Sequence, residues 1–400
     1  MRYPRYSFHG LLYNPCQDVA TDADLAPAGR KSYAPGMSRP RNLFERNPVL
    51  TIVLVNLAIL VLLDVAAGFF VASWRHDTFR RPDPNFHHGL KPGRSARHTW
   101  GPNEYPIYTD SLGFKDRDTR AISLVPAGKR IVFIGDSFTE GIGYPFEKTF
   151  VGLVAEQLGP GGIEVLNAGV IGYSPRLYYL KIKDLIERVG LRFDELYVFI
   201  DISDPINELE YEGYRPADSP LVRAASRLDE ALLERSALYY LLRSTIAGRE
   251  QVRSWKALHG DHPQWVGPQT AIHDPDVESY WTLNRGLYTR YAARGLHLAE
   301  ENMDRLVELC RQHGIRVTLA VYPWPIQIIN GDLFSLQVSF WQNYTDRRGL
   351  ELINFFPAFI RKGEDPAAVV GRYFIPGDDH LNEEGHRLVA NECLRRRPTQ

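Results

Sequence analysis

The sequence predicts an α/β fold, a three-layer parallel sheet with helices on both faces, preceded by one transmembrane helix. Three observations predict it. Short apolar runs alternate with amphipathic helical patterns from Arg130 onward, polar side chains follow the end of each run, and one long segment upstream is apolar on every side.

Composition restricts the class of protein. The 400 residues are 44% hydrophobic and 24% charged, as in a globular protein and unlike a disordered chain. The formal net charge of −1 gives no reason to expect a nucleic-acid partner. Cys16, Cys310 and Cys393 form neither a disulfide framework nor a CxxC motif. Buried thiols are favoured for Cys310 and Cys393, with a disulfide between them as the alternative in an exported domain.

Residues 49–72, "VLTIVLVNLAILVLLDVAAGFFVA", are the predicted transmembrane helix, because 24 apolar residues can cross about 30 Å of hydrocarbon. Asn56 and Asp64 oppose this prediction, since an acid within a membrane is costly. A buried core helix and a cleaved signal peptide are the weaker alternatives. The basic residues on the two sides are nearly balanced, so the positive-inside rule favours a cytoplasmic N-terminus only slightly.

The segments around this helix lack regular patterns. Residues 1–48 are predicted to be a disordered N-terminal tail, and translation could start at Met1 or at Met37. Residues 73–128 are rich in Pro, His and Arg, and we expect a stalk and domain-edge segment there. Its adjacent His87 and His88 are expected to be surface residues and not metal ligands. A single domain is then expected over 129–400.

The strands and helices of this domain follow in order. "RIVFIGD" (130–136), "GIEVLNAG" (162–169) and "DELYVFIDIS" (194–203) are the first three predicted strands. Helices are expected between them over 147–159 and 174–190, the second with Ser174 at its N-cap and a proline next. Two more strands, 315–323 and 350–355, follow predicted helices around Met303 and Phe340. A long insertion is expected at about 209–298.

Polar residues gather where these strands end. Ser137 follows the first strand, "NAG" (167–169) ends the second, and "DISDPIN" (201–207) ends the third. "GDDHLNEEGH" (377–386) lies near the C-terminus. Parallel sheets bind ligands at the carboxyl ends of their strands, so these side chains are expected to meet at one edge. The alternative for Ser137 is that it only helps to cap the following turn.

This set of motifs resembles the SGNH, or GDSL, hydrolase superfamily. The resemblance covers about residues 129–390 and rests on Gly135-Asp136-Ser137 and on the C-terminal histidine block. It implies a flavodoxin-like sheet, with Ser137 as nucleophile, His380 as general base and Asp378 as the acid that orients it. It also implies an oxyanion hole from the Ser137 and Gly169 N–H groups and the third block.

Two blocks depart from the family pattern. Where the family has Gly-x-Asn-Asp, this chain has Asp201-Ile202-Ser203-Asp204, so Ser203 takes the asparagine position, with Asn207 as the alternative donor. The family's Asp-x-x-His becomes Asp-x-His at Asp378 and His380, which resembles the branch that acetylates exopolysaccharides. His386 is expected to be a helix residue.

The resemblance implies a serine esterase that acts on acyl esters, with acetyl esters of glycans as the expected substrates. The alternatives are an O-acyltransferase for an exported polysaccharide and a non-catalytic glycan-binding or assembly protein. No cofactor, metal or nucleic acid is expected; the expected partners are a small-molecule or glycan ester and the membrane. The expected location is the inner membrane, with a periplasmic catalytic domain. Trp255, Trp265, Tyr280 and Trp281 of the insertion could stack on sugars or pack a small subdomain.

Overall fold

The computed structural model describes residues 42–71, 79–216, 219–246 and 277–397. The chain forms two compact units, Met1–Leu60 and Val61–Gln400. Most of the predicted N-terminal tail lies outside the described residues, as do Trp255 and Trp265 of the insertion.

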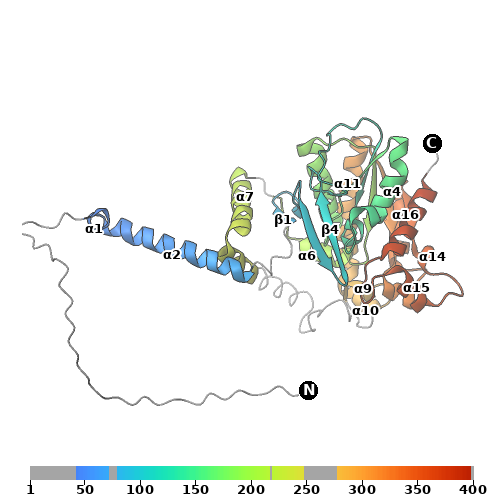
Figure 1. Cartoon of the computed structure of the whole chain (residues 1–400). Helices are drawn as coiled ribbons and strands as arrows, with labels where there is room; N and C mark the ends of the chain where they lie inside the picture. Colours follow the sequence, from blue (N-terminus) through green and yellow to red (C-terminus); the bar gives the residue numbers. More distant parts are fainter. Residues whose placement is uncertain (1–41, 72–78, 217–218, 247–276, 398–400) are drawn as a thin grey trace, which may run out of the picture. The chain divides into compact units, whose positions relative to one another are not determined.

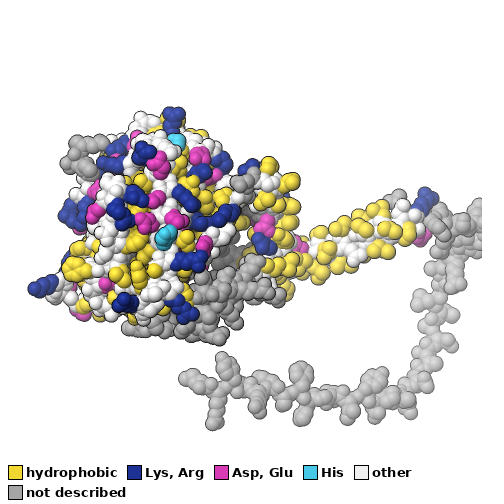
Figure 2. Space-filling model, turned by 180° about the vertical axis from the view of Figure 1, so that it is seen from behind, with side chains coloured by type: hydrophobic (Ala, Val, Ile, Leu, Met, Phe, Trp, Pro, Cys, Tyr) yellow, Lys and Arg dark blue, Asp and Glu magenta, His cyan; other side chains and the backbone are white. Residues whose placement is uncertain are grey.

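The predicted transmembrane segment is a helix. A short helix, α1 (Leu43–Arg46), precedes α2 (Pro48–Val71). Residues Pro48–Phe70 have a mean hydropathy of 2.7 and are long and apolar enough to cross a membrane. Hydrophobic side chains cover most of the visible face of this helix in Figure 2.

The two polar residues of α2 both have hydrogen-bond partners. Asn56 donates from Nδ2 to the Ile52 carbonyl 2.8 Å away, one turn earlier in the same helix. Asp64 Oδ1 accepts from Ser236 Oγ and from the Leu238 N–H, each at 2.8 Å. The Asn56 bond stays within α2 and reduces the cost of this polar side chain in an apolar helix, which was part of the objection that the sequence raised.

The core of the second unit is an eight-stranded sheet with the order β10-β9-β8-β6-β7-β5-β4-β3 (Figure 1). Five of these strands are parallel: β6 (Arg130–Ile134), β7 (Glu164–Asn167), β8 (Glu195–Ile200), β9 (Arg316–Val321) and β10 (Glu351–Asn354). In chain order their arrangement is 2-1-3-4-5, the flavodoxin-like order. The predicted parallel sheet is confirmed, and β6 and β8 are buried along their full length.

Residues 73–128, expected to be a stalk and domain-edge segment, contain strands. β3 (Ser95–Trp100), β4 (Asn103–Thr109) and β5 (Lys115–Asp116) extend the sheet in antiparallel fashion beyond β7. β1 (Arg80–Asp83) and β2 (His87–Leu90) form a separate hairpin. The sheet is therefore mixed. Short strands with alternating half-buried polar residues, such as β3, give a weaker apolar pattern than a central strand does.

Helices cover both faces of the sheet. On one side α4 (Phe150–Leu158) packs against α16 (Glu383–Arg396). On the other side α5 (Pro175–Lys183) and α6 (Asp204–Tyr211) pack against α11 (Ala293–Gln312). Ion pairs such as Arg348–Asp304 (2.5 Å) join α13 (Leu336–Arg348) to α11. The other described helices are α3 (Ser137–Glu140), α7 (Pro220–Arg235), α9 (Val277–Tyr280), α10 (Arg285–Leu287), α12 (Pro325–Ile329), α14 (Phe356–Phe359) and α15 (Pro366–Tyr373).

The insertion and the cysteines have packing roles in the described part of the chain. Trp281 is fully buried and donates from Nε1 to the Ile202 carbonyl at 2.7 Å, so its ring is core and not a sugar platform. Cys310 and Cys393 are free, buried thiols, as the sequence favoured. Burial raises the pKa of Cys310 to about 12.

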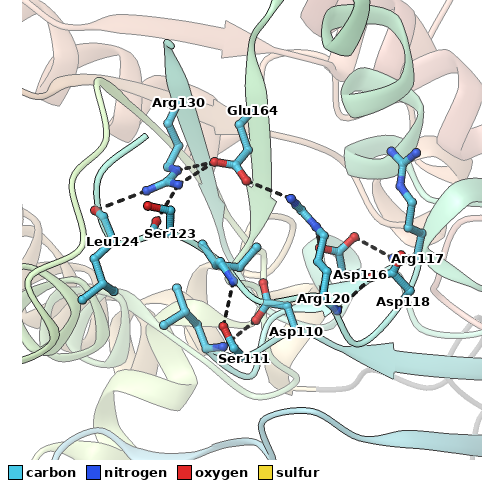
Figure 3. A network of polar contacts seen from close by, with 12 residues as sticks. Asp110, Ser111, Asp116, Arg117, Asp118, Arg120, Ser123, Leu124, Arg130 and Glu164 are labelled. Atoms are coloured by element: carbon cyan, nitrogen blue, oxygen red, sulfur yellow. Dashed lines mark hydrogen bonds and ion pairs between the residues drawn. The ribbon is translucent and has the colours of Figure 1, made fainter. Parts of the chain in front are cut away.

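A polar network closes the edge where the parallel strands begin (Figure 3). Arg130, only 1% exposed, donates to Glu164 Oε2 (2.7 Å), to the Arg192 carbonyl (2.9 Å) and to the Ser123 carbonyl (2.7 Å). Arg120 bonds the other Glu164 oxygen at 2.9 Å. The network attaches the loop before β6 to the first residues of β6 and β7.

Candidate active site

Ser137 lies directly beyond the carboxyl end of β6. The strand passes through Gly135 and Asp136 into the single turn of α3, which begins at Ser137. Asp136 caps this turn by accepting from the Phe138 N–H at 3.0 Å. A Cβ at Gly135 would lie 2.2 Å from Thr139 Oγ1, so the sharp turn leaves room only for glycine. Both expected features are present: Asp136 caps the turn, and the turn brings the serine to the strand-end edge.

Asp378 and His380 form a hydrogen-bonded pair between α15 and α16. Asp378 Oδ1 accepts from His380 Nδ1 at 2.5 Å and from its backbone N–H at 2.9 Å. A turn bond from the Asp378 N–H to the Ile375 carbonyl and a bond from the Ile375 N–H to the His380 carbonyl fix the loop. The structure therefore brings together the Asp-x-His pair that the sequence singled out. His386 lies in α16, as expected, and accepts from the Phe150 N–H.

Phe138, the residue after Ser137, contacts the histidine of the Asp378–His380 pair. The ring of Phe138 stacks on the imidazole of His380 with centroids 5.0 Å apart and an interplanar angle of 28°. His380 Nε2, the nitrogen that faces away from Asp378, is buried and has no hydrogen-bond partner in the described part of the protein. Ser137 Oγ donates to Asp136 Oδ2 at 3.3 Å. A change of the Ser137 χ1 rotamer would release the hydroxyl from Asp136.

Asp378 raises the pKa of His380, and Trp100 in turn bonds to Asp378. Burial alone would lower the pKa of His380, but its hydrogen bond to Asp378 and that residue's charge outweigh burial and raise it. Burial would likewise raise the pKa of Asp378, yet bonds from His380 and Trp100 lower it. Trp100 Nε1 donates to Asp378 Oδ2 at 2.8 Å, and its ring lies edge-on to His380. An imidazolium at this position would be stabilised.

Trp100 is the site residue that sequence reasoning missed. It is the last residue of β3, 278 positions from Asp378 along the chain. No local pattern connects a tryptophan in an irregular, basic segment with a C-terminal acid. The only sequence signal was the isolated aromatic residue itself.

Three buried carboxyl groups lie beneath the serine. Asp136 is 3% exposed, and Asp201 and Asp204 are fully buried. Burial and then the charge of Asp201 raise the pKa of Asp136 and also that of Asp204 well above the ordinary range. Their oxygens accept from Tyr322, Trp324 and Tyr178 side chains. Neutral donors, and not cations, satisfy this cluster.

In the loop after β7, nearly every N–H from residue 168 to residue 173 is already used. The Gly169 N–H donates to Asn167 Oδ1 at 3.0 Å, and the Ile171 N–H donates to Glu140 Oε2 at 2.9 Å. The Ala168, Val170 and Tyr173 N–H groups bond to backbone carbonyls. Only the Gly172 N–H has no acceptor among the described residues. Gly172 has a φ of 72°, in the left-handed region that glycine adopts without strain.

The loop after β8 holds the other proposed donor. The Ser203 hydroxyl donates to Asp201 Oδ1 at 2.6 Å and also lies 3.2 Å from Asn207 Oδ1. Asn207 lies in α6, and its side-chain nitrogen donates to no described residue. Ser203 is therefore occupied by Asp201, whereas the Asn207 amide group is free to donate.

Within the described ranges, no group of three or more His, Cys, Asp and Glu side chains is arranged to hold a metal ion. The arrangement at the strand ends is suited to nucleophilic chemistry: a hydroxyl, a paired imidazole and unpaired N–H groups.

Comparison with known proteins gives structural similarities only. No family model and no curated protein matches the sequence. An alpha/beta hydrolase from the metagenome of Lake Arreo aligns at 15% identity over 68% of this chain and 96% of its own, with a TM-score of 0.37. A catalytic mutant of an acetylxylan esterase from Geobacillus stearothermophilus aligns at 13% identity over 68% and 95%, with a TM-score of 0.36. A GDSL-like lipase from Bacteroides thetaiotaomicron aligns at 12% identity over 67% and 86%, with a TM-score of 0.34. The assignments below rest on this chain's own residues.

Proposed function

We propose that this chain is a serine esterase of the SGNH type, anchored by α2, that cleaves acyl esters through an acyl-serine intermediate. One observation carries the proposal. The buried His380, paired with Asp378 and with Nε2 unpartnered, stacks on the residue that follows a strand-end serine. A paired imidazole beside a hydroxyl is the minimum needed to activate a serine.

The reaction follows from these groups. His380 Nε2 takes the Ser137 proton as Oγ attacks the ester carbonyl carbon, and Asp378 stabilises the resulting imidazolium. The imidazolium then gives its proton to the leaving alkoxide oxygen, and the acyl group stays on Ser137. A water molecule, deprotonated by the same imidazole, hydrolyses the acyl-serine and restores the enzyme.

The oxyanion needs donors that are free before the reaction. The Ser137 N–H, at the first turn of α3, makes no hydrogen bond to a described residue and is the first donor. Gly169 would have to break its bond to Asn167 to act as the second, whereas Gly172 in the same loop would not. Asn207 is preferred over Ser203 as the third donor for the same reason. A lost donor typically costs about 3 kcal/mol of barrier.

Labelling of the full chain by a serine-directed phosphonate tests the nucleophile. Wild type should be labelled once and the Ser137→Ala variant not at all, and hydrolysis of an activated acetyl ester should disappear with the label. Label that persists in the alanine variant would exclude Ser137 as the nucleophile. A wild-type chain that neither labels nor hydrolyses would instead favour the glycan-binding or assembly function.

Esterase and O-acyltransferase share every catalytic group, so the acceptor must separate them. The GDS motif and the Asp-x-His pair resemble those of an ester-cleaving superfamily, so we propose hydrolysis of acetyl esters on glycans first. The test is to add a sugar acceptor to the assay with an acetyl ester. Faster turnover, with acetylated sugar as the product, would show that the protein is an acyltransferase and not an esterase.

The proposed location is the inner membrane with the catalytic domain outside the cytoplasm. It is supported by the mostly apolar segment of 23 residues, Pro48–Phe70, and by the glycan ester proposed as substrate. An alkaline phosphatase fusion after Arg81 should be active in a bacterial host. An inactive fusion, together with an active cytoplasmic reporter at the same position, would reverse the orientation.

A further inference from the structure

A concave site lies between α5, the segment after α6 and α11. Its volume is about 300 Å³, and its walls include Arg176, Tyr179, Tyr214, Arg215, Asn302 and Arg305. We call it the arginine cavity. This volume is at the lower end of those of small-molecule sites, enough for a ligand the size of one sugar.

Three guanidinium groups reach this cavity from three separate elements. Arg176 comes from α5, Arg215 from the segment after α6, and Arg305 from α11. Among the described residues, no carboxylate lines the cavity, and none of the three arginines makes an ion pair with any of them. Like charges brought together in this way cost free energy unless an anion is present. The whole chain has a net charge of −1, so the positive charge at this cavity does not reflect a general excess of basic residues.

The acids close to the cavity are already engaged. Glu208 accepts from the Ser174 hydroxyl, the Arg176 backbone N–H and the Asn302 amide. Glu212 pairs with Arg294 at 2.6 Å. Burial lowers the pKa of Arg176, and the charges of Arg215 and Arg305 lower it further against the opposing effect of Glu208. The neighbouring acids therefore do not neutralise the positive charge of the three arginines, which a bound anion would do.

The Arg176 side chain is held with one edge free. Its Nη1 donates to the Glu212 and Tyr214 carbonyls, both at 3.0 Å, which fixes the guanidinium in place. Its Nε is buried without a partner among the described residues. The Nε–Nη2 edge is the one that binds carboxylate or phosphate through two parallel hydrogen bonds. A fixed guanidinium with this edge free is prepared for an oxyanion.

We infer that the arginine cavity binds a sugar-sized ligand that carries a carboxylate or a phosphate group. Arg176 would bind the anionic group through its free edge, and Arg215 and Arg305 would add charge. Tyr179 and Tyr214 also line the cavity, and their aromatic rings add apolar surface for a sugar ring. This site does not depend on the serine chemistry.

Calorimetric titration of the full chain in detergent tests this inference with three probes: inorganic phosphate, D-galacturonate and D-galactose. Phosphate and galacturonate should saturate one site, and uncharged galactose should not bind. Arg215→Gln and Arg305→Gln should each weaken binding about 10-fold, the effect of losing one charged hydrogen bond. Both side chains are exposed, so the fold should tolerate these changes.

Arg192→Gln is the matched control, because it removes the same charge from an exposed side chain just before β8. It should bind as wild type does. If anion binding is weakened equally in all three variants, the effect is general electrostatics and the proposed site is wrong. The absence of saturable binding of either anion up to about 10 mM would also overturn the site. Binding of galactose as tightly as galacturonate would also overturn it. The Ser137→Ala variant should bind both anions normally, which separates this inference from the esterase proposal.

Discussion

Glu164 and Glu195, at one edge of the central sheet, have different partners from Asp136 and Asp204 at the other edge. At the edge where the strands begin, Glu164 and Glu195 are met by cations: Arg130 and Arg120 for the first, Lys129 (2.5 Å) and Arg316 (2.8 Å) for the second. Burial would raise the pKa of Glu195, but Lys129 and Arg316 outweigh it and lower that pKa. At the edge where the strands end, Asp136 and Asp204 have raised pKa values.

The difference separates charges that stabilise the fold from the groups proposed to react. Paired ions at the strand starts, such as Arg130 with Glu164, attach loops to the sheet (Figure 3). At the strand ends, the unpaired N–H groups, the free imidazole nitrogen and the uncompensated acids cost stability, and such strain is common at active sites. Substitutions where the strands begin should therefore change stability, and substitutions where they end should change activity.

Ser137→Ala should have the largest effect on activity. Loss of the nucleophile should lower kcat for an activated acetyl ester by on the order of 10⁴- to 10⁶-fold. The melting temperature should change little, since the hydroxyl makes only one long bond, 3.3 Å to Asp136. Steady-state kinetics measures the fall in kcat, and thermal denaturation followed by circular dichroism measures the melting temperature. Loss of folding in this variant would contradict the division between the two edges.

Arg130→Met should have the largest effect on stability. It leaves the Arg192 and Ser123 carbonyls without a donor and Glu164 with one cation fewer, so the free energy of unfolding should fall by about 3 kcal/mol. Urea denaturation measures the change, and kcat of the folded protein should be retained.

The control for this substitution is Arg97→Met, whose side chain is 70% exposed and pairs with Glu104 on the surface. It should cost less than about 1 kcal/mol. Equal losses in the two variants would mean that the buried network contributes no more than a surface pair.

Two neighbouring side chains, Asn207 and Ser203, are the candidates for the third oxyanion donor. Asn207→Ala should lower kcat about 10-fold or more with little change in KM, because its donor acts once charge has developed on the ester oxygen. Ser203→Ala should lower kcat less, since its hydroxyl is engaged by Asp201. The reverse order would return the role to Ser203, which takes the asparagine position of the family pattern.

The pH profile should show the smallest shift. His380 must be neutral to accept a proton, so kcat/KM should fall as the pH drops through its raised pKa, above the ordinary value of about 6.5. Asp378→Asn removes the bond and charge that raise this pKa, so the acid limb should move to lower pH while the rate falls. Asp379→Asn, which removes a weaker contribution, should move it less. An acid limb that stays in place without Asp378 would show that another group titrates.

Local sequence determined the elements and most of the chemistry. Short apolar runs bounded by turn residues indicate buried strands, so β6, β8 and β9 were predicted within a few residues, and the long, mostly apolar α2 was predicted from length and composition. Ser137 and the pair Asp378–His380 could be selected because their short motifs resemble those of a hydrolase superfamily. The edge strands β3 to β5 were missed, because their half-exposed residues carry no strong period.

Only the tertiary structure decided which polar atoms are free. Whether Gly169 or Gly172, and Ser203 or Asn207, can donate depends on partners such as Asn167 and Asp201, whose positions relative to them depend on loop conformation. Trp100 reaches Asp378 across 278 positions, and the arginine cavity joins residues of three elements. Hydrogen bonding and charge pairing act at about 3 Å, and a sequence does not specify which distant groups come that close.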